Sequence, residues 1–189
     1  MPDNDLFTDP AFNSKGIDLG QLYHVGIVTY DLDEAVQRYS QAFGIDNWRS
    51  RTNQPAAPTP QPVAHGEPAR VPVQKWAYTN YEKFPWIEFL QPDISVDSVL
   101  TRFLKERGEG VHHLGFFVDD LRLAVQQAEE RGVTADFTSF RGGENGEPVR
   151  GIAYLSPKQA KGISMELVSP DLRDILVNFV KTGEWPETL

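Results

Sequence analysis

His24-Val-Gly-Ile-Val-Thr-Tyr-Asp-Leu-Asp-Glu-Ala-Val-Gln37 is repeated later in the chain as His113-Leu-Gly-Phe-Phe-Val-Asp-Asp-Leu-Arg-Leu-Ala-Val-Gln126, at a constant offset of 89 residues. The two stretches are identical at seven of fourteen positions. Each begins as a β-branched and aromatic run typical of a strand, and then changes to the roughly 3.6-residue period of an amphipathic helix. The repeat predicts that one supersecondary unit is used twice.

The repeat continues beyond these helices. Ala77-Tyr78 recurs as Ala153-Tyr154, and Glu88-Phe-Leu-Gln-Pro92 recurs as Glu166-Leu-Val-Ser-Pro170. Each half therefore carries a strand with a histidine, a helix, a middle strand with Ala-Tyr and a final strand with a glutamate. This order predicts an α+β fold in which two tandem βαβββ modules form a cup-shaped sheet about a pseudo-twofold axis.

The chain divides around this repeat. We expect an N-terminal arm over residues 1–20 and a domain over 21–170, with module 1 at about 21–100 and module 2 at about 110–170. Residues 52–72 hold six prolines without periodicity, which indicates a long irregular loop. Residues 171–189 read as an amphipathic helix and a tail. Within the modules we expect helices over 31–43 and 120–131, and strands over 23–30, 73–79, 86–91, 133–137, 151–155 and 163–168.

Composition excludes several classes of protein. The 189 residues carry a net charge of −9, which disfavours nucleic acid or an anionic membrane as a partner. The chain has no cysteine, so disulfides and thiolate metal sites are ruled out. The acidic N-terminus lacks the features of a signal peptide, and no apolar run reaches the roughly 20 residues of a membrane span. We expect a cytoplasmic protein.

Four polar residues recur on the predicted inner strands, and they point to a metal ion. Strand alternation places His24, Glu88, His113 and Glu166 on the faces that meet if the modules pack about a twofold axis. Burying an unpaired glutamate costs several kcal/mol of folding free energy, by order of magnitude, and a bound cation removes that cost. Nitrogen and oxygen ligands suit one divalent ion such as Co, Ni, Mn, Fe, Mg or Zn, with positions left open for substrate. The same alternation turns His112 to the other face, and His65 falls in the proline-rich loop.

Large apolar residues are expected to line the cup around these ligands. Trp86, Phe117, Trp76 and Leu90 are the candidate substrate-binding residues. Plain core packing is an equal alternative for each of them. If they face the ligand, the substrate has an apolar body beside its chelating oxygens.

Three motifs carry a resemblance to a known family. Tyr23-His-Val-Gly-Ile-Val, Glu109-Gly-Val-His-His-Leu-Gly and Ser156-Pro-Lys-Gln-Ala-Lys-Gly-Ile-Ser-Met-Glu-Leu167 resemble the vicinal oxygen chelate (glyoxalase/bleomycin resistance/dioxygenase) superfamily, nearest its methylmalonyl-CoA epimerase and glyoxalase I branches. The resemblance implies the two-module cup and assigns the four metal positions, in order, to His24, Glu88, His113 and Glu166.

Two departures from the epimerase pattern bear on the chemistry. The epimerase branch has Gln at the second metal position, so Glu88 resembles the ligand set of glyoxalase I instead. The epimerase branch also places an acid/base glutamate that is not a metal ligand at a position equivalent to about Lys75 here. None of residues 73–80 carries a carboxylate.

We therefore expect a metal-dependent enzyme that moves a proton next to a carbonyl, an epimerase or isomerase acting on an acyl-CoA thioester or small keto compound. Glu166 is the first candidate for the catalytic base and Glu88 the second. Alternatives are a glyoxalase I-like lyase, then an extradiol-type dioxygenase, or a non-catalytic protein that binds small molecules. A homodimer is also expected.

Overall fold

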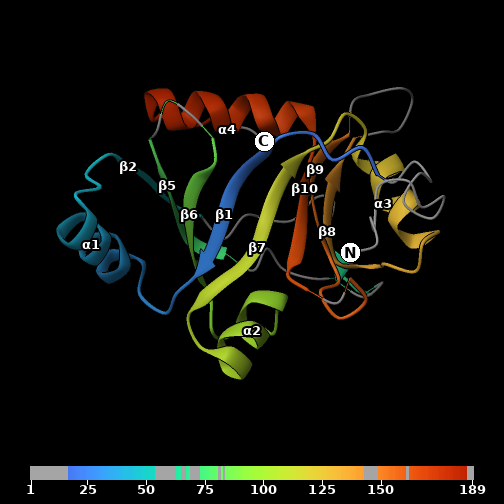
Figure 1. The fold of residues 1–189 in the computed structure, drawn as a ribbon, viewed down its shortest axis with the longest axis horizontal. Coiled ribbons are helices and arrows are strands. Elements are labelled where there is room, and N and C mark those ends of the chain that lie inside the picture. Colours follow the sequence, from blue (N-terminus) through green and yellow to red (C-terminus); the bar gives the residue numbers. More distant parts are fainter. Residues whose placement is uncertain are drawn as a thin grey trace, which may run out of the picture.

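A computed structural model describes residues 17–53, 63–64, 67–68, 73–80, 82, 84–142, 149–160 and 162–186 of the chain. In this part, four helices surround one curved ten-stranded sheet (Figure 1). None of these helices is long and apolar enough to cross a membrane. The predictions for the N-terminal residues 1–16 and for His65 lie outside the described residues.

Each module supplies four strands and a helix. Module 1 holds β1 (Leu22–Val28), α1 (Leu32–Phe43), β2 (Trp48–Thr52), β5 (Val73–Thr79) and β6 (Trp86–Pro92). Module 2 holds β7 (Gly110–Phe117), α3 (Leu121–Glu129), β8 (Ala135–Arg141), β9 (Arg150–Leu155) and β10 (Ser164–Val168). The remaining elements are β3 (Val63–Ala64), β4 (Glu67–Pro68), α2 (Val99–Arg107) and α4 (Pro170–Thr182).

The strand order confirms the predicted two-module fold. It runs β2-β5-β6-β1 through module 1 and β7-β10-β9-β8 through module 2, followed by β3 and β4. The strands β1 and β7 pair antiparallel at the centre, while β6 lies parallel to β1 and β10 parallel to β7. A half-turn about an axis between β1 and β7 therefore exchanges the modules.

The repeated Asp-Leu of the sequence begins the helix of each module. The side chain of Asp31 accepts a hydrogen bond from the Glu34 amide at the start of α1, and Asp120 accepts one from Leu123 at the start of α3. Gly44 ends α1 with a φ of 69°, a left-handed conformation that favours glycine.

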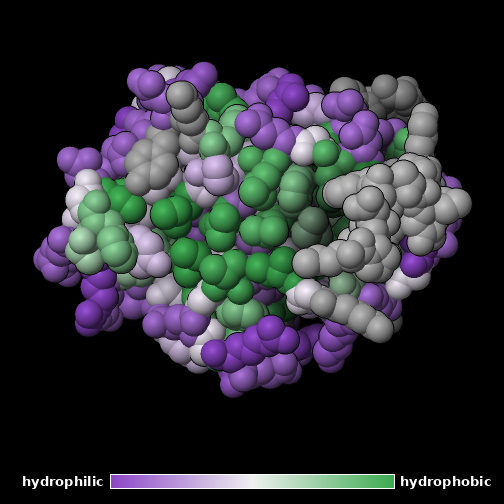
Figure 2. Space-filling view, in the orientation of Figure 1, coloured by the Kyte–Doolittle hydropathy of each residue, from purple (hydrophilic) through white to green (hydrophobic). Residues whose placement is uncertain are grey.

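The helices cover the two faces of the sheet in pairs. On the outer face, α1 packs on Ala77 and Phe89, and α3 packs on Ala153 and Leu167. Between them, hydrophobic residues gather over the middle of the sheet (Figure 2). The helices α2 and α4 close opposite ends of the central strands (Figure 1).

Three features of the fold were not anticipated from the sequence. The strand β2 and the helix α2 have no predicted counterpart, and the segment 52–72, expected to be irregular, contributes the two-residue strands β3 and β4. The helix α2 begins at Ser98, whose side chain and that of Thr101 form a capping box. The strand β2 lies at an edge of the sheet with polar side chains, so it lacks the apolar run of a central strand.

Candidate metal centre

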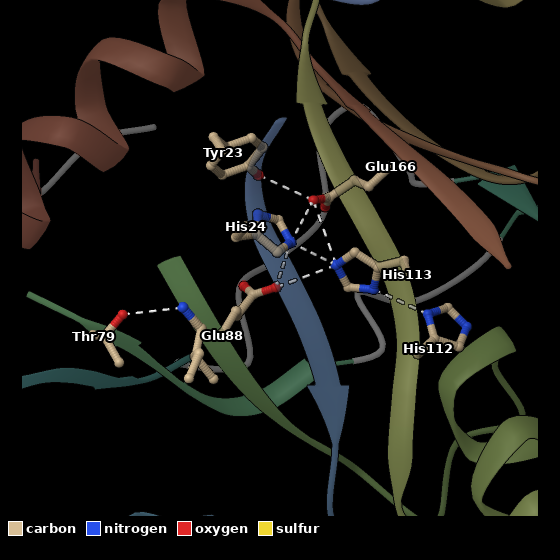
Figure 3. A network of polar contacts seen from close by, with 8 residues as sticks. Tyr23, His24, Thr79, Glu88, His112, His113 and Glu166 are labelled. Carbon is tan, nitrogen blue, oxygen red and sulfur yellow. Dashed lines mark hydrogen bonds and ion pairs between the residues drawn. The ribbon is translucent and has the colours of Figure 1, made fainter. Parts of the chain in front are cut away.

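Four side chains converge between the central strands (Figure 3). His24 comes from β1, Glu88 from β6, His113 from β7 and Glu166 from β10, and one donor atom from each lies within 4.8 Å of all the others. Glu88 Oε2 lies 3.0 Å from His24 Nε2 and 3.3 Å from His113 Nε2. Glu166 Oε2 lies 3.2 Å and 3.6 Å from the same two nitrogens. The strand order thus brings together all four predicted ligands.

The cluster is sealed from solvent. Both imidazoles are 0% exposed, and the two glutamates are 5% and 4% exposed. Among the described residues, Glu88 Oε2 makes no hydrogen bond, and the two Nε2 atoms face each other at 2.7 Å. A cation shared by the four donors would satisfy these groups, and an N₂O₂ donor set suits a borderline or hard divalent ion. The residues therefore fit the metal that the sequence predicts.

Two glycines of the repeat make room for the imidazoles. Gly26 pairs with His113 across the central strands, and Gly115 pairs with His24. A Cβ on Gly26 would lie 2.1 Å from the ring of His113, and a Cβ on Gly115 would lie 2.3 Å from the ring of His24. Each histidine thus lies over the glycine of the other module, which explains why the pattern His-x-Gly occurs twice.

We expect Gly115→Ala to destabilise the protein by about 1–3 kcal/mol, because the added methyl collides with a buried ring that has nowhere to move. Thermal unfolding of the variant, followed by circular dichroism, measures the effect. Gly162→Ala is the matched control, since its Cβ would lie 3.9 Å from the nearest atom. Equal melting temperatures for the two variants would contradict the role assigned to Gly115.

A bulge in each central strand adds one further side chain to the site. The pairing of β1 with β7 shifts between Leu22 and His24, and again between Gly26 and Ile27. The extra residues are Tyr23 and His112, which occupy equivalent positions in the repeat. A bulge interrupts the alternation of side chains. The prediction that His112 faces away from His113 is therefore wrong.

Both bulge residues contact candidate ligands. The hydroxyl of Tyr23 donates to Glu166 Oε2 at 3.0 Å, and the Nδ1 atoms of His112 and His113 lie 3.0 Å apart (Figure 3). Such outer contacts hold ligands in one orientation. Strand periodicity does not indicate that either residue contacts the cluster. The Val-His-His motif does single out His112, because it places His112 next to a candidate ligand.

Burial controls the protonation of the groups around the cluster. It raises the pKa of Tyr23 and of Tyr78 well above the usual value, and the charges of Glu166 and Glu88 raise both further. Burial and the charge of His113 lower the pKa of His112 to about 3. The phenols are therefore hydrogen-bond donors at neutral pH, and the His112 imidazole is neutral.

The two glutamates experience different environments. Burial, the largest effect, raises the pKa of Glu166 despite the neighbouring imidazoles. For Glu88 burial acts in the same direction, but the nearby imidazoles of His24 and His113 outweigh it and lower the pKa. A pair of carboxyl groups whose pKa values are pushed apart is a common arrangement for acid and base roles.

The predicted substrate-binding residues lie at two ends of the site. Trp76, Trp86 and Phe117 form one buried cluster with Leu176 and Phe179 of α4. Leu90 lies at the other end, where it packs with Val28 and with Leu100 and Leu104 of α2. All four candidates are at most 8% exposed.

Lys75, at the slot of the epimerase glutamate, does not approach the cluster. Its ammonium group pairs with Asp33 at 2.8 Å on the outer side of module 1. Tyr78, further along the same strand, lies beside the cluster, and its ring centroid is 5.6 Å from that of His24.

A curved sheet of two βαβββ modules, with one histidine and one glutamate from each meeting at its centre, defines a class of fold. Comparison with known families identifies the class. Residues 23–154 match the Glyoxalase/Bleomycin resistance protein/Dioxygenase superfamily, and the chain belongs to this superfamily.

Within the superfamily, the chain is similar to methylmalonyl-CoA epimerases. It is 30% identical over 152 residues to the mitochondrial enzyme of Dictyostelium discoideum, an alignment that covers 80% of this chain and 79% of that protein. It is 28% identical over 150 residues to the human enzyme, covering 79% of this chain and 73% of that protein.

A solved structure gives the same result. The Streptomyces coelicolor methylmalonyl-CoA epimerase, as a variant in complex with 2-nitronate-propionyl-CoA, aligns with a TM-score of 0.58 and 25% identity. The alignment covers 80% of this chain and 97% of that one.

Proposed function

We propose that this protein is a metal-dependent enzyme that moves a proton on the carbon next to a carbonyl, as an epimerase or isomerase of an acyl thioester or small keto compound. The observation that carries the proposal is the buried cluster of His24, Glu88, His113 and Glu166. A protein that only bound small molecules would gain nothing from four convergent, desolvated donors.

His24, Glu88, His113 and Glu166 would hold one divalent ion. When bound, such an ion draws charge from a substrate carbonyl oxygen and so acidifies the neighbouring C–H. The chain's own residues would orient the substrate and keep water away, because the buried aromatic side chains around the cluster form a low-dielectric wall.

Glu166 is the base that we assign to the proton. Burial raises the pKa of its carboxyl group, and a carboxylate held beside the substrate can accept and return a proton. Tyr23 donates to Oε2 of Glu166 and so fixes which oxygen faces the ligands. Glu88 approaches from the other module and is the candidate for the second acid/base group, since β5 supplies no carboxylate.

The reaction is tested by deuterium exchange. We expect the protein to exchange the proton next to the carbonyl of propionyl-CoA or methylmalonyl-CoA in deuterated water, followed by nuclear magnetic resonance, with the rate restored to chelated protein by added Co²⁺ or Mn²⁺. An unchanged spectrum for these thioesters, together with turnover of methylglyoxal and glutathione, would instead establish a glyoxalase I-like lyase. Glu88 at the second ligand position favours that alternative.

We further propose a homodimer formed through the outer face of the sheet. Ile87, Val25, Leu114 and Met165 are neighbours across the four central strands, and all four are half-buried and apolar. Ile87 packs with the core cluster under α1, and Met165 packs with the cluster under α3. Because this face crosses the pseudo-twofold axis and carries no charge along the row, a second copy of the same face suits it.

Light scattering after size exclusion tests the dimer. We expect the wild-type chain to elute as a dimer and Leu114→Lys to elute as a monomer, because a charge at the centre of the row would be buried without a partner. Leu123→Lys is the control, since Leu123 is 48% exposed on α3. A monomeric wild-type protein would refute the interface.

A further inference from the structure

The two candidate histidine ligands are held in different ways, although the modules are related by symmetry. The Nδ1 atoms of His112 and His113 share a hydrogen bond of 3.0 Å (Figure 3). The Nδ1 atom of His24 is buried and makes no hydrogen bond within the described part of the chain. A metal-binding histidine usually donates its second N–H to a neighbouring group, which fixes the orientation of the ring. The orientation of His24 therefore needs another support.

Aromatic rings provide that support. Tyr23 stands where the repeat has His112, but its hydroxyl donates to Glu166 and not to His24. The ring of Tyr23 instead packs against the imidazole of His24, with centroids 4.1 Å apart and planes at 82°. The ring of Tyr78 approaches the same imidazole at 5.6 Å and 77°. Such edge-to-face contacts are attractive and depend on direction, so they can orient a ring.

Behind Tyr78, a row of aromatic rings leads to the helix α4. The ring centroid of Tyr78 lies 5.5 Å from that of Trp76, and Trp76 lies 4.9 Å from Phe179 of α4. We call Tyr78, Trp76 and Phe179 the aromatic row. Trp185, just beyond α4, contacts Trp76 and Phe179 at 5.2 Å and 5.6 Å. The row joins α4 to a candidate ligand by direct ring contacts.

The aromatic row has little freedom to move. Its three rings are at most 7% exposed, and the indole N–H of Trp76 donates to Asn53 at 3.0 Å. The helix α4 lies across the ends of the central strands of both modules (Figure 1). It is fixed at its start, where the Ser169 amide donates to the carbonyl oxygen of Gly151 at 3.1 Å. Beyond its end, the guanidinium of Arg51 lies over the ring of Trp185.

Module 2 lacks this arrangement. Ile152 takes the place of Trp76 in the repeat, so the row of rings has no counterpart there. In addition, α4 lies beyond residues 23–154, the part of the chain that matches the superfamily. The support of His24 by α4 is thus a feature of this chain that neither the repeat nor the family match contains.

We propose that α4 is a positioning element of the metal centre. Packing of Phe179 on Trp76, of Trp76 on Tyr78 and of Tyr78 on His24 holds the imidazole of His24, as the hydrogen bond to His112 holds that of His113. The inference rests on the metal site of the proposed function and adds the part of the chain that maintains it. Its consequence is that a substitution on α4 changes the affinity for metal, although α4 supplies no candidate ligand.

The affinity of the protein for Co²⁺ tests this role. It is measured by competition with a chromophoric chelator, and the visible absorption of bound Co²⁺ reports the geometry of the site. We expect Phe179→Ala to weaken Co²⁺ binding about tenfold or more, as the loss of an outer contact to a ligand does, and to change the spectrum. Trp185→Ala, at a half-buried position, should have the same effect to a smaller extent.

Val125→Ala is the matched control, because it also removes buried apolar volume from a helix. Val125 is 7% exposed on α3 and packs on the outer face of the sheet, away from the four donors. We expect both Val125→Ala and Phe179→Ala to lower the melting temperature, and only Phe179→Ala to change the affinity and spectrum of Co²⁺. Equal affinities and spectra in the two variants would overturn the proposal and make α4 an ordinary part of the core.

A double-mutant cycle tests the route through the aromatic row. If Tyr78 carries the contact to His24, Phe179→Ala should cause no further loss of Co²⁺ affinity in a Tyr78→Leu protein. Losses that simply add would overturn the route. Cobalt binding needs no turnover, so the two proposals fail separately. A wild-type protein that binds Co²⁺ and exchanges no substrate proton would overturn the proposed reaction, and the cobalt affinities would still decide the role of α4.

Discussion

Replacing Glu166 by Gln should lower the rate of proton exchange on a thioester by about 10²–10⁴-fold, the usual contribution of a positioned general base. Gln keeps an oxygen donor at the same position but cannot accept the proton. Tyr23 can still donate to that oxygen, so the geometry around Oε should survive. The rate is measured by deuterium incorporation at saturating metal and substrate.

The control for this prediction is Tyr23→Phe, which removes only the hydrogen bond at 3.0 Å to Glu166. We expect a smaller loss of rate and retained metal. Because the phenol is a buried positioning group, its removal should also change the pH dependence of the rate, which a purely structural role would leave unchanged. A Glu166→Gln variant that exchanges protons at the wild-type rate would transfer the role of base to Glu88.

Removing the metal should lower the melting temperature by roughly 10 °C. A ligand that binds only the folded state at about a thousand times its Kd stabilises by about 4 kcal/mol, and each kcal/mol shifts the melting temperature of a chain of this size by about 2–4 °C. Here the effect has a specific cause, because chelation leaves Glu88 Oε2 and two facing imidazole nitrogens buried without a cation. Differential scanning fluorimetry with and without chelator measures the shift.

His113→Ala provides the comparison for the chelation experiment. This variant loses a ligand that is 0% exposed, so it should melt lower than wild type and respond to neither chelator nor added metal. A chelator-sensitive His113→Ala protein would mean that the ion is held elsewhere.

The sequence repeat alone predicts that the four candidate ligands converge. His24 and His113 recur with their glycines, and Glu88 and Glu166 recur in apolar strands, so one symmetry operation brings them together. The strand order confirms that operation. The convergence was predictable because strand register determines which face of the sheet each side chain occupies. The two-residue period of a strand shows that face in the sequence.

The surroundings of the centre were less predictable. Strand alternation predicts the wrong face for His112, because a bulge inserts one residue and leaves no mark in the pattern of apolar and polar residues. The helix α2 was missed since it has no counterpart of similar sequence in the repeat. Ser164 lines a cavity beside α2, whereas its counterpart in the repeat, Trp86, packs in the cluster with α4, and this difference is visible only in the folded structure.

The most direct test of the account is the metal content of the protein purified without chelator, measured by elemental analysis in wild type and in the double variant His113→Ala with Glu166→Gln. The four buried donors predict about one divalent transition-metal ion per wild-type chain and none in the double variant. A wild-type protein that contains no metal, and that takes up none from added Co²⁺, Ni²⁺, Mn²⁺ or Zn²⁺, would contradict the account and favour a protein that binds small molecules without chemistry.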